Sequence, residues 1–286
     1  MNKQLYSTRF FDGQVSGSLR SAGVVVPIVL SLFPIKSVVD VGCGVAPWAA
    51  TFLKCGVSDV LAIDGDYVDR GQLQVPTDMF LARDLESQLE LDRKFDLCVC
   101  LEVAEHLSSS RAESFVSDLT CLADCVLFSA AIPGPTGTGH INAQFLPYWV
   151  SLFAKQGYEA VDPIRPKIWG NDSVEWFYRQ NTVIFVAPGH PVLKMGFPRP
   201  LSMIHSQFYL QVLNAPPTLA VIGKLPAALV RSIKYRLGEM RVGIADTFAV
   251  LAAHETTASK GAGGRRIAKP LNNRDGAKTS RSGFAT

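Results

Sequence analysis

The chain has 286 residues, of which 48% are hydrophobic, and this apolar share excludes a chain that is disordered throughout. Its net charge of +3 is the difference between 28 basic and 25 acidic residues. Residues 1–189 carry 14 basic and 21 acidic side chains (14 − 21 = −7), whereas residues 190–286 carry 14 basic and 4 acidic ones (14 − 4 = +10). No specific binding of nucleic acid is therefore expected from the first part, and only the second has a charge suited to an anionic surface.

Six cysteines are too few for a disulfide scaffold in a chain of this length, and Cys98 and Cys100 lie within an apolar run. No histidine pair accompanies them at zinc-ligand spacing, so no metal site is predicted there. The first residues lack the apolar segment of a secretory signal, and the apolar runs are shorter than the roughly 20 residues that a membrane span needs. These features predict a cytoplasmic protein.

Short β-branched runs alternate with helical stretches between residues 37 and 187. Ser110-Arg-Ala-Glu113 has the pattern of a capping box and predicts a helix from there to Leu122. Another expected helix stops at Gly157, because glycine commonly caps a helix in the left-handed conformation. The remaining predicted helices cover 18–32, 48–54, 146–156, 204–213 and 226–242, and the predicted strands cover 37–42, 59–64, 79–83, 95–102, 125–133, 158–164 and 181–187.

Strands that alternate with helices form a mostly parallel sheet covered on both faces. The sequence therefore predicts a doubly wound α/β fold with a Rossmann-like, seven-stranded sheet, and the different connections of the last two strands allow one of them to run antiparallel. Prolines interrupt the pattern after residue 189, and glycine, serine and basic residues dominate the end of the chain. The expected parts are an N-terminal helical cover (1–34), a central α/β domain (35–189), a basic helical and irregular extension (190–258) and a disordered basic tail (259–286).

The segment Asp40-Val41-Gly42-Cys43-Gly44 ends the first expected strand. Glycines at this place let a ligand approach the backbone at the carboxyl edge of the sheet. Asp64 ends the second strand 20 residues after Gly44 (64 − 44), where a carboxylate can accept hydrogen bonds from both hydroxyls of a ribose. Dinucleotides and S-adenosylmethionine are both bound by such an arrangement.

Two residues help to decide which of these two cofactors the chain binds. A dinucleotide fingerprint has a third glycine or alanine where this chain has Pro47. The carboxylate of Asp40 would oppose a pyrophosphate, whereas it suits the positively charged amino and sulfonium groups of S-adenosylmethionine. The sequence therefore favours S-adenosylmethionine over NAD, which stays open as the cofactor of an oxidoreductase.

The order of these motifs resembles the class I S-adenosylmethionine-dependent methyltransferases over about residues 35–187. Other stretches resemble a group of bacterial proteins that are often described only as a methyltransferase domain and whose substrates are mostly unassigned. The motifs of the class are DVGCG (40–44), AIDGD (62–66), ARDLE (82–86), FDLCVCLEVAEHL (95–107) and LFSAAIPG (127–134), and those of the group are GQVSGSLRSAG (13–23), GTGHINAQFLPYW (137–149) and VEWFYRQN (174–181).

The resemblance implies a role in cofactor binding for the residues at the ends of the first two strands. Asp40, Gly42 and Gly44 would line the methionine part of S-adenosylmethionine, and Asp64 would hold the ribose hydroxyls. The family often has a third glycine where this chain has Ala46, a small residue that weakens the match only slightly.

The resemblance extends to the next two strands. Asp84 would meet the adenine amino group, with Leu85 beside the ring. Glu102 closes the fourth strand next to the sulfonium. Helix capping and solvation at a strand end are the ordinary alternatives for these acids, and Asp78 could replace Asp84 if the register shifted.

Two histidines are the candidates for the acceptor side. His106 follows the fourth strand, and His140 lies in the loop after the fifth, so both are expected at the carboxyl edge as a base or an acceptor contact. A loop histidine that shapes the pocket is the alternative for each. Glu105 with both histidines offers metal ligands, but nothing in the sequence brings them together, and no metal is predicted.

Two further groups of residues have both a functional and a structural interpretation. The late cluster of aromatic residues and arginines would clamp an acceptor or, as is slightly favoured, form a lid with surface arginines. The serines before the expected first helix would cover the cofactor or cap the helix. The cluster comprises Arg165, Trp169, Trp176, Tyr178 and Arg179, and the serines are Ser16, Ser18 and Ser21.

The sequence thus predicts a bacterial methyltransferase that acts on a small-molecule or sugar-containing acceptor, with O-methylation placed first. The alternative is a non-catalytic cofactor-binding protein that docks a glycan-synthesis or membrane partner through its basic C-terminal region. The tail 259–286 has seven basic residues but no interleaved aromatic residues, so at most a weak contact with an anionic surface is expected.

Overall fold

The structure, a computed structural model, describes residues 8–134 and 137–214. These residues fall in one compact unit, Met1–Ala215, which is distinct from a second unit, Pro216–Thr286. The helix predicted over 226–242 and the tail predicted over 259–286 lie outside the described residues. Within the described part, no helix has the length and apolar character needed to cross a membrane.

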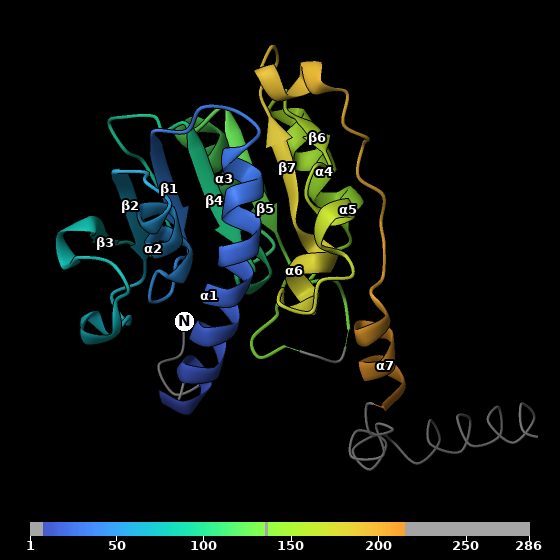
Figure 1. Cartoon of the computed structure of the whole chain (residues 1–286), viewed down its shortest axis with the longest axis horizontal. Coiled ribbons are helices and arrows are strands. Elements are labelled where there is room, and N and C mark those ends of the chain that lie inside the picture. The colour runs from blue at the N-terminus through green and yellow to red at the C-terminus, as the bar shows by residue number, and fades with distance from the viewer. Residues whose placement is uncertain (1–7, 135–136, 215–286) are drawn as a thin grey trace, which may run out of the picture. The chain divides into compact units, whose positions relative to one another are not determined.

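Seven strands form one sheet with the order β3-β2-β1-β4-β5-β7-β6 (Figure 1). Strands β1 to β5 run parallel to one another, and β7 runs antiparallel to both β5 and β6. This arrangement confirms the predicted doubly wound, mostly parallel sheet with an antiparallel strand near its end. The strands are β1 (Ser37–Val41), β2 (Asp59–Asp64), β3 (Phe80–Ala82), β4 (Leu97–Leu101), β5 (Cys125–Ser129), β6 (Glu159–Val161) and β7 (Val183–Val186).

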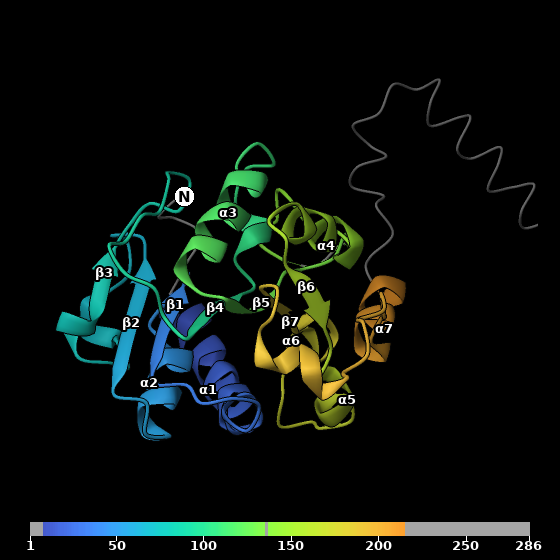
Figure 2. The ribbon, with the colours of Figure 1, turned by 90° about the horizontal axis from the view of Figure 1, so that it is seen from above.

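Helices cover both faces of the sheet (Figure 2). The two sides of the sheet bury separate hydrophobic clusters, one with residues of α1, α2 and α6 and the other with residues of α3 and α4. The helices are α1 (Thr8–Leu30), α2 (Pro47–Lys54), α3 (Ala112–Leu122), α4 (Leu146–Lys155), α5 (Arg165–Ile168), α6 (Trp176–Asn181) and α7 (Ser206–Asn214), and the short 3-10 turns are η2 (Arg70–Gln72), η3 (Thr77–Met79), η4 (Ala104–His106) and η5 (Pro191–Met195).

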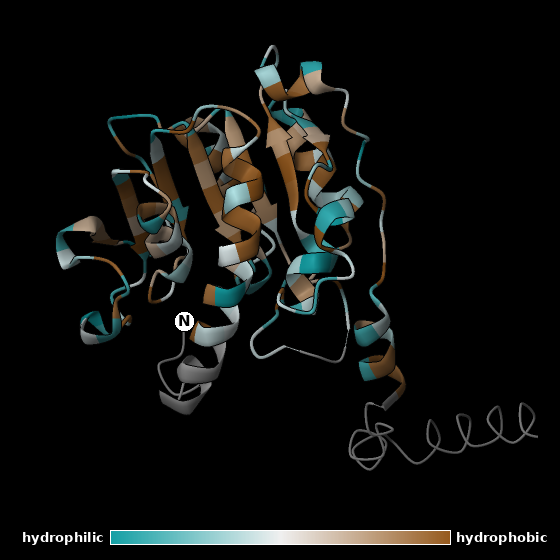
Figure 3. Ribbon diagram, in the orientation of Figure 1, coloured by the Kyte–Doolittle hydropathy of each residue, from teal (hydrophilic) through white to brown (hydrophobic). Residues whose placement is uncertain are grey.

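Most residues of the strands are apolar because the sheet is buried on both faces. In β1, Val38 belongs to one hydrophobic cluster and Val39 to the other, as the two-residue alternation of a strand requires. The central strands are accordingly brown along their length in Figure 3, which colours each residue by hydropathy. Between β7 and α4, Phe153 stacks on Phe185 with ring centroids 3.7 Å apart.

Two helix starts differ from the prediction. The first helix begins at Thr8, ten residues before the predicted start at 18. The capping box is wrong: α3 begins at Ala112 without a side-chain cap, and the hydroxyl of Ser110 pairs with Ser108. At this start the Arg111 guanidinium points inward, to the carboxylate of Asp118 and the carbonyl oxygens of Leu85 and Ser87, and these long-range contacts set the helix start.

The segment that follows β7 packs on the α/β core as far as it is described. The N–H of Asp162 donates to the carbonyl of Pro198 at 2.9 Å, and the N–H of His205 donates to the side chain of Gln180 at 2.7 Å. The boundary between the two units falls after Ala215, and the start of the extension at residue 190 stays a prediction.

Candidate functional site: the carboxyl edge of the sheet

The loop after β1 takes a conformation that glycine favours. Gly42 and Gly44 have φ angles of +77° and +56°, and Ala46 has +65°. A Cβ on Gly42 would lie 2.3 Å from the side chain of Val103, whereas a Cβ on Gly44 would enter open space. Gly42 therefore serves close packing, and Gly44 leaves room at the mouth of the loop. Ala46 holds the left-handed conformation that the third glycine of the family would adopt without strain.

Asp64 is buried at the end of β2 and is held in place by donors from two loops. Its carboxylate accepts the N–H of Gly44 at 2.7 Å and the N–H of Gly65 at 2.6 Å, and the hydroxyl of Tyr67 donates to it as well. Burial raises the pKa of Asp64 above its ordinary value, and these three donors lower it in part. Tyr67 is missing from the residues predicted for the site, although its place three residues after Asp64 is a signal that could have identified it.

Asp40 lies deeper, at the end of β1, with 3% of its surface exposed. One oxygen accepts the N–H of Ala49 at 3.1 Å. Burial raises the pKa of Asp40 to about 7, and the neighbouring charge of Asp64 adds to the rise. A buried carboxylate in this state gains free energy from a cation placed beside it. It faces a hollow lined by Val15, Ser18, Asp40, Gly42, Cys43, Gly44, Val45, Pro47, Trp48, Leu101, Glu102 and Tyr178.

Glu102 follows β4 on the other side of this hollow. Its φ of +58° is rare for a residue with a side chain, and such strain is concentrated at functional sites. Its N–H donates to the carbonyl of Ser129 at 2.9 Å, and its carboxylate accepts the side-chain N–H of Asn181 at 3.2 Å. The structure thus places Asp40, Gly42, Gly44 and Glu102 around one hollow, and Asp64 is hydrogen-bonded to its rim at Gly44.

Asp84 and Leu85 follow β3 at the same edge of the sheet, apart from the hollow that Asp40 and Glu102 line. Asp84 is exposed, and its carboxylate accepts the N–H of Glu86 at 3.1 Å, which closes a local turn. Leu85 is 8% exposed and packs in the hydrophobic cluster that α3 and α4 cover. The expected adenine contacts of these two residues stay predictions.

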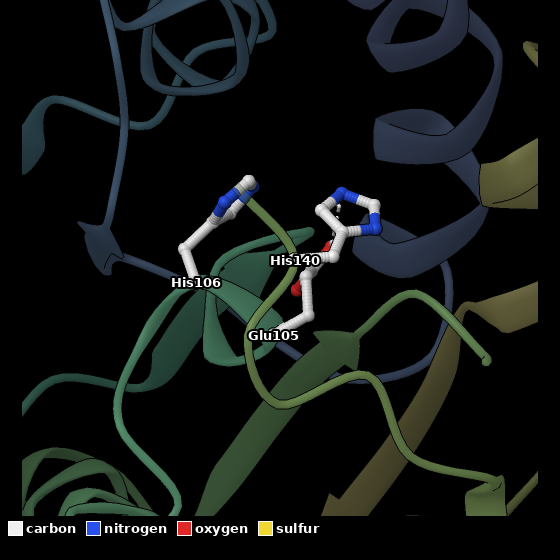
Figure 4. A group of neighbouring side chains, drawn as sticks. All are labelled: Glu105, His106 and His140. Carbon is white, nitrogen blue, oxygen red and sulfur yellow. Dashed lines mark ion pairs between the residues drawn. The ribbon is translucent and has the colours of Figure 1, made fainter. Parts of the chain in front are cut away.

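The two candidate histidines meet beside Glu105 (Figure 4). Glu105 and His106 belong to η4 after β4, and His140 comes from the loop between β5 and α4. The imidazole rings lie edge to face with centroids 4.9 Å apart, and His140 Nε2 lies 4.0 Å from Glu105 Oε1. Gly137 makes room for this arrangement, because a Cβ there would lie 2.0 Å from the ring of His140.

Burial governs the protonation of these three residues. It lowers the pKa of His106, and it lowers the pKa of His140 to about 4, with the charge of His106 adding to the fall. Burial and the nearby carboxyl of Glu102 raise the pKa of Glu105 well above its ordinary value. The two imidazoles are therefore neutral at pH 7, with lone pairs available to a ligand.

A second hollow, mostly apolar, lies beyond β5. Ala130 and Ile132 line it, and between them the N–H of Ala131 approaches Glu105 and lowers the pKa of that carboxyl in part. Asn181 lines it as well and donates to Glu102. This hollow therefore borders both acids after β4. Its lining comprises Phe128, Ala130, Ile132, Phe145, Leu146, Trp149, Arg165, Gln180, Asn181, Ser202, Met203 and Ile204.

The prediction that the arginines of the late aromatic cluster lie at the surface is wrong. Arg165 and Arg179 are 1% and 4% exposed. Arg165 pairs with Asp162 at 2.7 Å and donates to the carbonyls of Gln180 and Leu201. These partners, from the β6–α5 connection, α6 and the segment before α7, enclose the guanidinium, which therefore holds the elements together instead of lying at the surface.

The predicted capping of the first helix by Ser16 or Ser18 is wrong as well, since both serines lie inside α1. Ser21 donates to the carbonyl of Gly17 at 2.7 Å within the helix. Ser18 instead lines the first hollow, and its hydroxyl lies 3.1 Å from that of Tyr178, which also accepts the indole N–H of Trp48. Ser18, Tyr178 and Trp48 therefore form one wall of the hollow that Asp40 faces.

Fold and site together define the class of protein. A sheet with an antiparallel seventh strand between the fifth and sixth, a glycine loop after β1 and acids after β1 and β2 are the features of class I S-adenosylmethionine-dependent methyltransferases. The residues fit that cofactor, because the hollow presents the buried Asp40 and the half-buried Glu102 to a cationic ligand and Gly44 leaves space for it.

The sequence comparison agrees with this class. Residues 20–124 match the Methyltransf_23 family, described as a methyltransferase domain. The chain carries a class I S-adenosylmethionine-dependent methyltransferase domain, and S-adenosylmethionine is the cofactor of that domain. No curated protein matches the sequence.

Solved structures with a similar fold have low sequence identity. An O-methyltransferase family protein from Burkholderia thailandensis is 14% identical, with a TM-score of 0.49, and the match covers 64% of this chain and 60% of that one. The sugar N-methyltransferase KedS8 from a Streptoalloteichus species is 13% identical, with a TM-score of 0.49 and coverage of 63% and 91%. The amino pentose methyltransferase CalS10 from Micromonospora echinaspora is 13% identical, with a TM-score of 0.47 and coverage of 65% and 99%.

Proposed function

We propose that this chain transfers a methyl group from S-adenosylmethionine to a hydroxyl group of a small or carbohydrate-like acceptor. The observation that carries the proposal is the pair of neutral imidazoles, His106 and His140, beside Glu105 at the edge where the cofactor hollow ends. A polar group at this place contacts the acceptor, while Asp40 and Glu102 face the cofactor.

S-adenosylmethionine supplies a methyl group on a positively charged sulfur: the acceptor oxygen bonds to the methyl carbon, the C–S electron pair stays on sulfur, and the hydroxyl proton leaves. The chain therefore has to align the acceptor with the methyl group, exclude water and receive or release that proton. His106 is suited to hold the hydroxyl because its Nδ1 lies 3.2 Å from the carbonyl of Gly139. This contact places the ring proton on Nδ1 and leaves Nε2 as an acceptor.

The remaining residues have roles in binding the cofactor. Asp64 accepts hydrogen bonds from the ribose hydroxyls, which replace the hydrogen bond from the hydroxyl of Tyr67. Asp40 and Glu102 balance the charge of the amino and sulfonium groups. Asp84 and Leu85 meet the adenine, as the resemblance implies.

The apolar hollow supports the acceptor class. Aromatic side chains line it, among them Phe145 and Trp149, and the amides of Gln180 and Asn181 lie on one side. A sugar or a hydroxylated ring has one apolar face and a polar edge, which matches such a lining. Because Asn181 also donates to Glu102, a ligand in this hollow lies close to the cofactor.

The test is methyl transfer from isotope-labelled S-adenosylmethionine to a panel of hydroxylated sugars and metabolites, with the position of the label read by mass spectrometry. We expect label on an oxygen, and a turnover number in His106→Ala that is at least tenfold lower while cofactor affinity changes little. His190→Ala is the matched control, because that imidazole caps η5 and lies outside the site. Absence of turnover with the whole panel, or label on nitrogen only, contradicts the proposal.

The second hypothesis, a cofactor-binding protein without turnover, predicts that the acceptor side is unbuilt. The gathering of His106, His140 and Glu105 favours the enzyme instead. Most of the basic C-terminal region on which that hypothesis depends lies beyond residue 214, where the described part of the chain ends, and its weak contact with an anionic surface stays a prediction.

A further inference from the structure

Glu105, His106 and His140, the Glu105 cluster, bring three metal-ligating groups to one point (Figure 4). One ligand atom from each residue lies within 4.8 Å of the ligand atoms of the other two. Glu105 and His106 follow β4, whereas His140 lies in the loop after β5. A hydrogen bond between His106 and Gly139, 33 residues apart, joins the two segments. The cluster is thus assembled by the fold and is not a feature of one local segment.

The carboxylate of Glu105 lacks the partners that a buried acid normally has. Its side chain is 0% exposed, and in the described part of the chain no donor reaches either oxygen with hydrogen-bonding geometry. The N–H of Ala131 approaches it without meeting that geometry, and His140 Nδ1 is buried without a partner too. Next to the carboxyl of Glu102, such an acid stays protonated in the absence of a cation, and a cation beside it stabilises the ionised form. The two oxygens without hydrogen bonds are therefore free to coordinate a cation.

The backbone around the cluster orients its members before any ligand arrives. The carbonyl of Gly139 lies at His106 Nδ1, so Nε2 of that ring keeps its lone pair. The carbonyl of Glu105 accepts the N–H groups of Ile141 and Asn142, both at 2.9 Å. The loop that carries His140 is therefore attached to the residue that supplies the carboxylate.

We propose that the Glu105 cluster binds one divalent transition-metal ion through two imidazole nitrogens and one carboxylate oxygen. Two imidazoles with one carboxylate are a donor set of catalytic zinc sites and of iron(II) sites, whereas magnesium and calcium prefer oxygen ligands throughout. Ligands of a tetrahedral zinc ion lie about 3.4 Å apart, given metal–ligand distances of roughly 2.0–2.2 Å. Small side-chain rotations, above all of His140 with one-fifth of its side chain exposed, bring the three atoms to that spacing.

The surroundings favour a cation at this point. Two further acids lie at the same carboxyl edge, Glu102 directly after β4 and Asp64 at the end of β2, and their negative charge attracts a cation. The three protein ligands also leave coordination positions open, as in catalytic and not structural metal sites. This site replaces the expectation from the sequence that these residues hold no metal.

A metal ion at this place has a direct use in the chemistry, and this part rests on the proposed function. A cation that contacts the acceptor oxygen lowers the pKa of its hydroxyl, and the proton then leaves to solvent. Under this proposal the two histidines hold the cation and do not themselves take the proton. Metal binding is a separate matter and needs no acceptor.

The test is titration of the full chain, free of any affinity tag, with Co²⁺ by calorimetry and by visible absorption in the absence of acceptor. We expect one Co²⁺ per chain, with ligand-field bands typical of nitrogen and oxygen ligands and displacement by Zn²⁺. Glu105→Gln and His140→Ala are expected to weaken Co²⁺ binding at least tenfold and to change the bands. Binding of S-adenosylmethionine by each variant shows that it is folded.

His190→Ala is the matched control, since it removes an imidazole outside the cluster, and its Co²⁺ affinity is expected within twofold of the wild type. If Glu105→Gln does not fold, the half-buried loop residue His140 provides the variant that decides. The proposal is overturned if the wild type binds no Co²⁺, or if Glu105→Gln and His140→Ala bind it as tightly as the wild type. A chain that binds Co²⁺ at the cluster but methylates no acceptor keeps the metal site and loses the proposed function.

Discussion

The carboxyl edge of the sheet holds two groups of acidic and polar residues that are built in opposite ways. The first group, which we call the cofactor half, comprises Asp40, Gly42, Gly44 and Asp64. Here Asp40 and Asp64 accept backbone N–H groups at 2.6–3.1 Å, so their carboxylates are held without a ligand. The second group, which we call the acceptor half, comprises Glu105, His106, His140 and the neighbouring pair Glu102 and Asn181. Here the side chain of Glu105 has no such donors in the described part of the chain. The first half is complete as it stands, whereas the second needs a ligand to complete it. Five predictions test this difference.

The largest effect is expected from Gly42→Ala, which perturbs the packing under the cofactor half. A Cβ there would lie 2.3 Å from Val103 and would force a left-handed conformation on alanine, so the unfolding free energy should fall by about 3 kcal/mol. Denaturant unfolding measures this loss. Gly170→Ala, where a Cβ meets nothing within 4 Å, is the control. An unchanged unfolding midpoint would show that Val103 does not close on the loop.

Gly44→Ala separates cofactor binding from packing. Its φ is positive but its Cβ would enter open space, so a stability cost of only about 1 kcal/mol is expected. The same Cβ narrows the hollow where the cofactor lies, and the affinity for S-adenosylmethionine should fall about thirtyfold. Calorimetric titration measures the affinity, with chemical unfolding alongside. An affinity equal to that of the wild type would place the cofactor away from Gly44.

The pKa of Asp40 predicts how cofactor binding depends on pH. Because this acid has a pKa of about 7 and pairs with a cationic ligand only when ionised, the affinity for S-adenosylmethionine should rise about tenfold between pH 6 and pH 8. Asp40→Asn should bind weakly at every pH and lose the rise. A wild-type affinity that is flat across this range would show that Asp40 does not face the positive charge.

The same shift has a consequence for stability. The folded chain holds the Asp40 proton more tightly than the unfolded chain, so the unfolding free energy of the ligand-free protein falls as pH rises from 3.8 to about 7. Asp40→Asn removes this contribution, and a comparison of unfolding against pH in the two proteins isolates it.

The smallest effect is expected from Asn181→Ala, which removes the donor to Glu102 between the two hollows. Loss of one hydrogen bond to a charged group costs about 1.5–3 kcal/mol where the group stays buried, and water that enters from the neighbouring hollow restores part of it. We expect the turnover number to fall about fivefold, with little change in the Kd of the cofactor. Gln72→Ala, at an exposed 3-10 turn, serves as the control. A loss in cofactor affinity alone would assign Asn181 to the cofactor half.

The cofactor half could be predicted from the sequence because it is local. Asp40, Gly42 and Gly44 lie in one five-residue segment, and Asp64 ends the neighbouring strand, so strand patterns alone place these residues together. The antiparallel β7 and the layers on both faces of the sheet also follow from the alternation of strands and helices.

In the acceptor half, the sequence predicts His106 and His140 at the carboxyl edge, but their contacts could not be predicted, because these contacts join distant segments. Asn181 reaches Glu102 across 79 residues, and His106 reaches Gly139 across 33. The buried arginines have the same cause: Arg165 is enclosed by Leu201, 36 residues away. The capping box failed for a related reason, since the long-range contacts of Arg111 decide where α3 begins.

The central claim is that a class I methyltransferase site binds S-adenosylmethionine through Asp64. Its most direct test is calorimetric titration of the wild type and Asp64→Ala with S-adenosylmethionine, with NADH as the control ligand and Asp66→Ala as the control variant, since Asp66 pairs with Arg70 at the surface. We predict micromolar binding of S-adenosylmethionine that Asp64→Ala weakens at least tenfold, about 1.4 kcal/mol, with no binding of NADH. A folded wild type that binds no S-adenosylmethionine, or binds it equally well without Asp64, would contradict the account.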